Sequence, residues 1–78
     1  MSVNVAQIRE LVDAITAGDK ERIDALAAAL GLRVEWYGAH LRLRRGERRV
    51  ACSLGMSRAQ LETQMRVLFG RLWLVARR

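Results

Sequence analysis

Two stretches near the N-terminus carry apolar residues at the spacing of amphipathic helices. In residues 5–17 the apolar positions recur every three or four residues, Asn4 stands at the N-cap position, and Gly18 follows the last turn. In residues 20–30 a similar spacing begins directly after Asp19, which is a second residue of the N-cap type. The pattern predicts two helices joined by a very short turn.

A third helix is predicted over residues 58–76. Ser57 and Gln60 have the spacing of a capping box, in which each side chain accepts the backbone N–H of the other residue. An apolar stripe then continues almost to the end of the chain, formed by Leu61, Met65, Leu68, Leu72 and Val75. We expect this stripe to face the core along one continuous helix.

Between the second and third helices the spacing of the apolar positions changes from about 3.6 residues to about 2. Apolar and polar residues alternate in residues 33–37, 40–45 and 48–54, as is typical of strands with one buried face. The dipeptides Gly38-Ala39 and Gly46-Glu47 separate the three segments, and a leading glycine suits a two-residue type II′ hairpin turn.

These turns define the register of the strands. They place Trp36 opposite Leu41 and Leu41 opposite Cys52, and they also bring the remaining apolar residues of the strands opposite one another. A shift of one residue would move every side chain to the wrong face. We therefore predict one small α+β domain over residues 1–78, in the order α-α-β-β-β-α, with a three-stranded antiparallel meander and helices packed on one face.

The same register predicts a basic surface on the opposite face of the sheet and at the tip of the second hairpin. Arg33, Arg44 and Arg49 form a row across the three strands, and Arg42 stands opposite Glu35. Like charges directly opposed in a sheet cost about 0.2–1 kcal/mol per pair, and an anionic partner would offset this cost. The candidate binding residues are Arg33, Arg42, Arg44, Arg45, Arg48, Arg49, Tyr37 and His40.

The net charge of +6 is concentrated in the second part of the chain. Residues 1–31 contain five acids and three bases, whereas residues 32–78 contain three acids and eleven bases, nearly all of the bases in the protein being arginine. The guanidinium group binds phosphate or carboxylate through two parallel hydrogen bonds. This distribution favours an anionic partner, although a solvated face that deters edge pairing would carry a similar pattern.

The sequence contains no pattern typical of an enzyme. It has no glycine-rich phosphate loop, no HExxH motif and no cluster of cysteine and histidine, and 78 residues leave little room for a concave site. His40 has no metal-ligand spacing to a second ligand. We expect no catalysis, no metal and no cofactor.

Cysteine usage and hydropathy bear on the compartment. Cys52 is the only cysteine, so the chain forms no internal disulfide, and we expect it at a core position. The longest strongly apolar stretch, residues 67–76, is interrupted by Arg71 and is half the length that a bilayer requires. These features predict a cytoplasmic protein that does not engage a membrane.

Two classes of function remain open. The arginine-rich face could bind nucleic acid, with Tyr37 stacking on a base. It could instead dock on an acidic protein surface, as a protein-binding module or inhibitor. Phage and mobile-element accessory proteins are often of this size and equally free of recognisable motifs. Capture of a partner with and without nuclease treatment distinguishes the two.

The C-terminal helix carries apolar residues outside its core stripe. A helix that is apolar nearly all round is usually buried on more than one side. That second surface could meet the N-terminal helices, a partner or another copy of the chain, and we expect a homodimer to form there. The residues that would make this contact are Val67, Gly70, Trp73 and Leu74.

The element order resembles that of the double-stranded-RNA-binding domain, and Gly55-Met56-Ser57-Arg58 resembles the start of its second helix. Two features depart from the pattern of that family. The long loop that this family inserts into the minor groove corresponds here to Gly38-Ala39, and its lysine cluster is reduced to Arg58. We do not assign the chain to that family.

Overall fold

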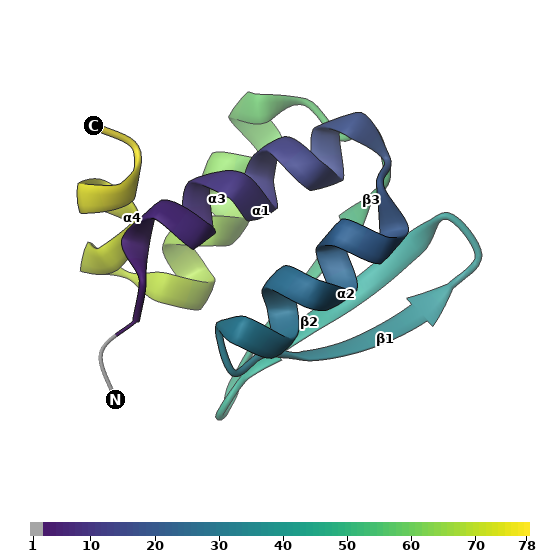
Figure 1. Ribbon diagram of the computed structural model, residues 1–78, viewed down its shortest axis with the longest axis horizontal. Coiled ribbons are helices and arrows are strands. Elements are labelled where there is room, and N and C mark those ends of the chain that lie inside the picture. The colour runs from purple at the N-terminus through teal and green to yellow at the C-terminus, as the bar shows by residue number, and fades with distance from the viewer. Residues whose placement is uncertain (1–2) are drawn as a thin grey trace.

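Four helices lie on one side of a three-stranded sheet in the computed structural model, which describes residues 3–78 (Figure 1). The predicted α+β class and the antiparallel meander β1-β2-β3 are confirmed. In chain order the elements are α1 (Val5–Ala17), α2 (Lys20–Ala29), β1 (Arg33–Tyr37), β2 (His40–Arg45), β3 (Arg48–Ser53), α3 (Arg58–Phe69) and α4 (Arg71–Ala76).

Polar side chains begin the first three helices as the sequence predicts. The side-chain oxygens of Asn4 and Asp19 accept backbone N–H groups of the first turns of α1 and α2, at 3.0 and 3.2 Å. At the start of α3 the Ser57 hydroxyl accepts the N–H of Gln60 at 3.3 Å, and the Gln60 amide oxygen accepts the N–H of Ser57 at 3.4 Å. These bonds satisfy N–H groups that have no partner within the helix.

The two hairpins have the predicted register. Trp36 pairs with Leu41 and Leu41 with Cys52, while the next apolar row consists of Val34, Leu43 and Val50. The first residue of each turn, a glycine, has a φ of 63° or 62°, as a type II′ turn requires. The third strand ends at Ser53, one residue earlier than expected.

The inner face of the sheet and the helices enclose a single apolar core. Leu41, Leu43 and Cys52 are buried on the sheet side. Trp36 lies at the margin of this core, where its indole Nε1 donates to Asp24 of α2 at 2.8 Å. The helices contribute the buried side chains of Ile8, Leu11, Val12, Ile15, Ile23, Leu61, Met65 and Leu68.

The prediction of one continuous helix over residues 58–76 is wrong, because the chain bends at Gly70. This residue has φ 57° and ψ −127°, a conformation outside the helical region, and it separates α3 from α4. The bend turns α4 toward α1 and resets the helical phase. Trp73 is therefore completely buried, whereas Val75, which was expected in the core stripe, is 52% exposed.

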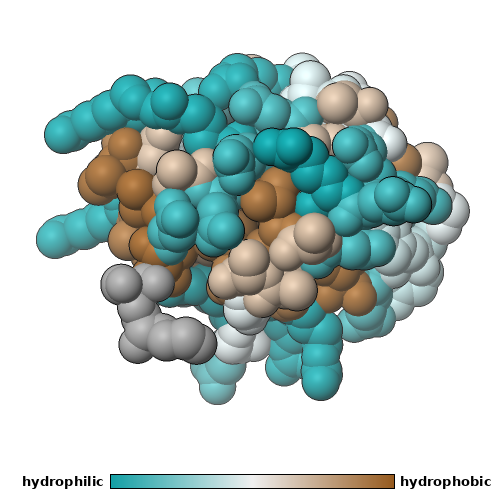
Figure 2. Space-filling model, viewed as in Figure 1, coloured by the Kyte–Doolittle hydropathy of each residue, from teal (hydrophilic) through white to brown (hydrophobic). Residues whose placement is uncertain are grey.

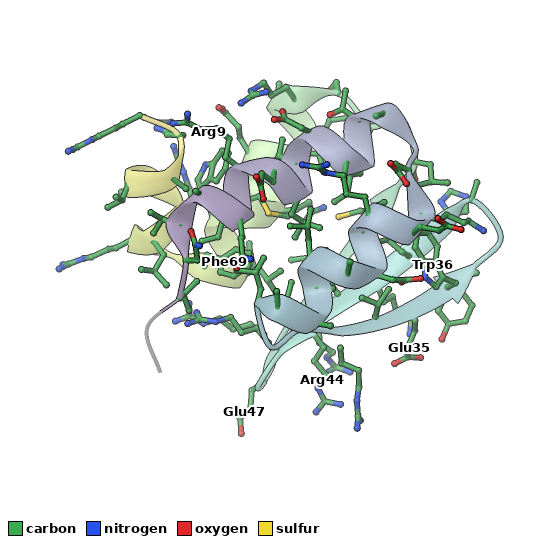
Figure 3. All side chains as sticks on the ribbon, viewed as in Figure 1. Arg9, Glu35, Trp36, Arg44, Glu47 and Phe69 are labelled. Carbon is green, nitrogen blue, oxygen red and sulfur yellow. The ribbon has the colours of Figure 1, made fainter. Side chains whose placement is uncertain are left out.

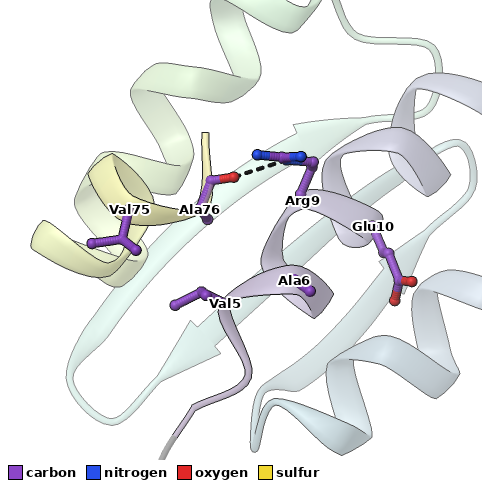
Figure 4. A pocket seen from close by; sticks show the side chains of 6 residues that line it. All are labelled: Val5, Ala6, Arg9, Glu10, Val75 and Ala76. Carbon is purple, nitrogen blue, oxygen red and sulfur yellow. Dashed lines mark hydrogen bonds between the residues drawn. The ribbon is translucent and has the colours of Figure 1, made fainter. Parts of the chain in front are cut away.

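The contact between α4 and α1 includes a hydrogen bond from one helix to the end of the other. Arg9 of α1 donates from Nε to the carbonyl oxygen of Ala76 at 2.8 Å (Figure 4), and its guanidinium also donates to the carbonyl of Arg78. Carbonyls at the end of a helix lack partners within the helix. Arg9 satisfies two carbonyls at the C-terminal end and holds α4 against the first helix.

Replacing Gly70 with asparagine tests the bend. Asparagine tolerates the left-handed helical conformation, with positive φ and small positive ψ, but not the conformation of Gly70. Gly18, at φ 71° and ψ 27°, offers a matched control for the same substitution. We expect Gly70→Asn to lower the free energy of unfolding by about 1–3 kcal/mol in urea titrations. Gly18→Asn should cost clearly less. Equal losses would contradict the proposed strain at Gly70.

Candidate nucleic-acid interface

One face of the sheet is left uncovered by the helices. We call it the outer face, and in Figure 3 the side chains of Arg44 and Glu35 project from it, away from the helical layer. All residues of this face are exposed except Ser53, which is half-buried. From one end to the other its three rows are Arg33–Arg44–Arg49, Glu35–Arg42–Ala51 and Tyr37–His40–Ser53.

The three arginines of the first row stand directly opposite one another. Arg33 pairs with Arg44, and Arg44 pairs with Arg49. The Arg44 Nε donates to the carbonyl of Gly46 in the adjacent turn at 2.9 Å, and this bond holds its side chain near the second hairpin. The row therefore concentrates positive charge at the end of the outer face where the second hairpin turns.

No arginine of the outer face takes part in an ion pair within residues 3–78. The two ion pairs found there are Arg22 with Glu10 at 3.9 Å and Arg58 with Asp13 at 3.2 Å, both on the helices. The positive charges of Arg33, Arg42, Arg44 and Arg49 are consequently available to a ligand from solvent.

At the opposite end of the outer face, Tyr37 is held by two neighbours. Its hydroxyl donates to Glu35 Oε2 at 2.8 Å, and the guanidinium carbon of Arg42 lies 5.2 Å from the ring centroid. The hydrogen bond and the negative charge of Glu35 raise the pKa of Tyr37 above its usual value of 10.0. Tyr37 as a whole remains 52% exposed, so it presents a neutral aromatic side chain beside the arginines.

The imidazole of His40 forms a polar pair with the neighbouring strand. Its Nδ1 lies 2.8 Å from the hydroxyl oxygen of Ser53, directly across from it in the sheet. Within residues 3–78 no group of three or more His, Cys, Asp and Glu side chains lies close enough to hold a metal ion. His40 and Ser53 therefore add hydrogen-bonding groups to the aromatic end of the outer face.

Arg45 and Arg48, which were expected to project at the hairpin tip, do not lie on the outer face, and of the two only Arg48 is exposed. They continue the strand positions that face the helices. Arg45 is half-buried; its guanidinium donates to the carbonyl of Leu68 at 3.4 Å and lies 5.4 Å from the ring centroid of Phe69. Arg48 lies beside Gly70, because a Cβ atom added to this glycine would lie 3.4 Å from the Arg48 Nη1. Their charges lie at the C-terminal end of α3, where positive charge is favourable.

The residues expected at a homodimer contact do not share one surface role. Trp73 is completely buried within the chain, so a second copy has no access to it, and Gly70 forms the bend. Val67 and Leu74 are 49% and 37% exposed. Figure 2 shows apolar surface toward the end of the molecule where α4 and the start of α1 lie, with hydrophilic side chains around it.

Two residues of the outer face, Ala51 and Ser53, were not identified from the sequence. Both alternate with buried Val50 and Cys52 along β3, and this alternation in the sequence indicates that they face outward. They were overlooked because a small side chain marks no chemistry by itself.

Comparisons with known proteins add no assignment, because no family model, no curated protein and no solved structure matches this chain. Among residues 3–78 no helix has the length and apolar character that crossing a membrane requires.

Cys52 is predicted to resist thiol reagents in the folded protein. Burial raises the pKa of its thiol from 9.0 to about 11, so it remains protonated and covered at pH 8. A disulfide reagent such as dithionitrobenzoate should label it only in denaturant. Because the unfolded thiol loses its proton at lower pH than the folded one, the free energy of unfolding should also fall as pH rises from 9.0 to about 11.

The variant Cys52→Ala serves as the control for the pH effect. Because this variant lacks the thiol, its free energy of unfolding should fall less between pH 9.0 and about 11 than that of the unchanged protein. Denaturant titrations at several pH values measure the difference. Fast, complete labelling in native buffer at pH 8 would contradict the assignment of Cys52 to the core.

Proposed function

We propose that this protein is a non-catalytic module that binds nucleic acid through the outer face of its sheet. The observation that carries the proposal is the row of Arg33, Arg44 and Arg49, whose like charges oppose one another. Within residues 3–78 none of the three forms an ion pair with a carboxylate. Such an arrangement costs stability in the absence of a ligand. A phosphate backbone supplies the missing negative charge and accepts bidentate hydrogen bonds from each guanidinium.

The geometry of the face suits this partner. Adjacent strands lie about 4.7–4.9 Å apart, so the row presents three long cationic side chains close together on one surface. Small sheets are also known to bind in DNA grooves, where side chains of the exposed face contact the backbone and the bases. Both modes require an open, uncovered face, and the outer face meets that requirement.

Tyr37 favours nucleic acid over an acidic protein surface. Carboxylates on a protein would satisfy the arginines equally well. A half-exposed neutral ring on the same face adds a group that stacks on bases and that carboxylates do not use. The acidic-protein partner therefore becomes one outcome of the test.

Replacing Arg33, Arg44 and Arg49 together with serine tests the proposal. We expect binding to a labelled oligonucleotide to be lost, and the slope of log affinity against log salt for any residual binding to decrease in size by up to about 3. Thermal stability should hold or rise, since each opposed pair costs about 0.2–1 kcal/mol. Fluorescence anisotropy at several salt concentrations measures the first effect and thermal denaturation the second.

The matched control removes the same charge from the helices. Arg66, Arg71 and Arg77 are exposed, and changing them to serine should leave most of the affinity in place. Equal losses in the two triple variants would show that net charge alone governs binding. A protein partner captured from lysate after nuclease treatment, and lost with the sheet variant, would replace nucleic acid with an acidic protein.

A further inference from the structure

The smallest side chain of the outer face, that of Ala51, lies in the middle of the edge strand β3. Two hollows adjoin over it. One, of about 270 Å³, is lined by residues that include Tyr37, His40 and Ser53, and the other, of about 290 Å³, is lined by residues that include Arg49. The two shallow hollows share Arg42 and Ala51 in their linings, and we call the surface that they cover together the trough.

The two ends of the trough offer different chemistry. The end at Tyr37 and His40 carries rings and a hydroxyl, which stack on a base or bond to its edge. The end at Arg42 and Arg49 carries guanidinium groups, which bind phosphate. A ligand that fills the whole trough therefore has an aromatic part and an anionic part next to each other.

Stacking on Tyr37 requires the flat face of a base. In duplex DNA the bases are paired and stacked on one another, so only their edges are accessible in the grooves. In a single strand a base can be turned outward and can stack on an aromatic side chain.

We infer that the trough holds a single-stranded nucleic acid, with one base against Tyr37, the sugar over Ala51 and a phosphate between Arg42 and Arg49. This inference rests on the proposed nucleic-acid function and narrows its substrate class. A duplex keeps its bases paired and stacked, so it would contact the arginines through phosphates and leave Tyr37 and the trough unused.

The ring of Tyr37 is already oriented for this role. Its hydroxyl donates a hydrogen bond to Glu35 at 2.8 Å and Arg42 lies over the ring, so binding a base requires little further ordering of the side chain. Its half-exposed surface leaves room for a base, and the raised pKa keeps it neutral next to phosphate.

The test compares a short fluorescent oligodeoxythymidine with a duplex of the same length by anisotropy at one salt concentration. Tyr37→Ala should weaken single-strand binding by about 5- to 150-fold, because stacking on one base contributes about 1–3 kcal/mol, and should leave duplex binding nearly unchanged. Tyr37→Phe keeps the ring and should retain most of the affinity. Ala51→Leu fills the trough without changing charge and should also weaken single-strand binding selectively.

The same substitution at Ala28, which is exposed on α2, is the matched control and should have no effect. Circular dichroism confirms that the variants fold, and the Tyr37 and Ala51 variants test the site independently of each other.

The failure of this inference is distinguishable from the failure of the proposed function. Equal affinity for duplex and single strand, with no loss of binding in Tyr37→Ala or Ala51→Leu, would overturn the assignment of the trough to single strands. Nucleic-acid binding itself would remain supported if the serine variant of the arginine row still lost its affinity. Absence of binding to both probes would overturn both.

Discussion

Burial of one face of the sheet is the constraint on which the rest of this structure depends. Leu41, Leu43 and Cys52 face the helices, and the alternation of the strands then directs Arg42, Arg44 and Arg49 to solvent. A shift of one residue in any strand would place guanidinium groups in the apolar core, where an unpaired charge is very costly. The hydrophobic effect and the cost of burying charge therefore select the same register.

The two groups of arginines on the sheet show how position decides the role of one residue type. Arg33, Arg44 and Arg49 point away from the helices and keep their charge available to a ligand. Arg45, one residue after Arg44 along the strand, points to the other side and stabilises the end of α3 through Leu68 and Phe69. Arg9 acts similarly at the end of α4. These arginine side chains thus either face solvent on the outer face or donate to carbonyls at the ends of helices.

The candidate site is a surface whose chemical character changes along its length. Its arginine row suits phosphates, its Tyr37 end suits bases, and Ala51 lowers the surface between them. A small domain whose helices cover only one sheet face leaves the other open without additional structure. The open face is therefore both a consequence of the size of the core and the feature that supports a binding role.

The order of the elements, the helix caps, the hairpin register and the outward arginine row were all predictable from the sequence, since each depends on neighbours or on alternation along one strand. The bend at Gly70, the burial of Trp73 and the inward contacts of Arg45 were decided only by the tertiary structure. A glycine costs a helix only about 1 kcal/mol, so the local sequence permits either a straight or a bent helix. Packing of Trp73 into the core decides between them, because its burial requires contacts from elements far away in the chain.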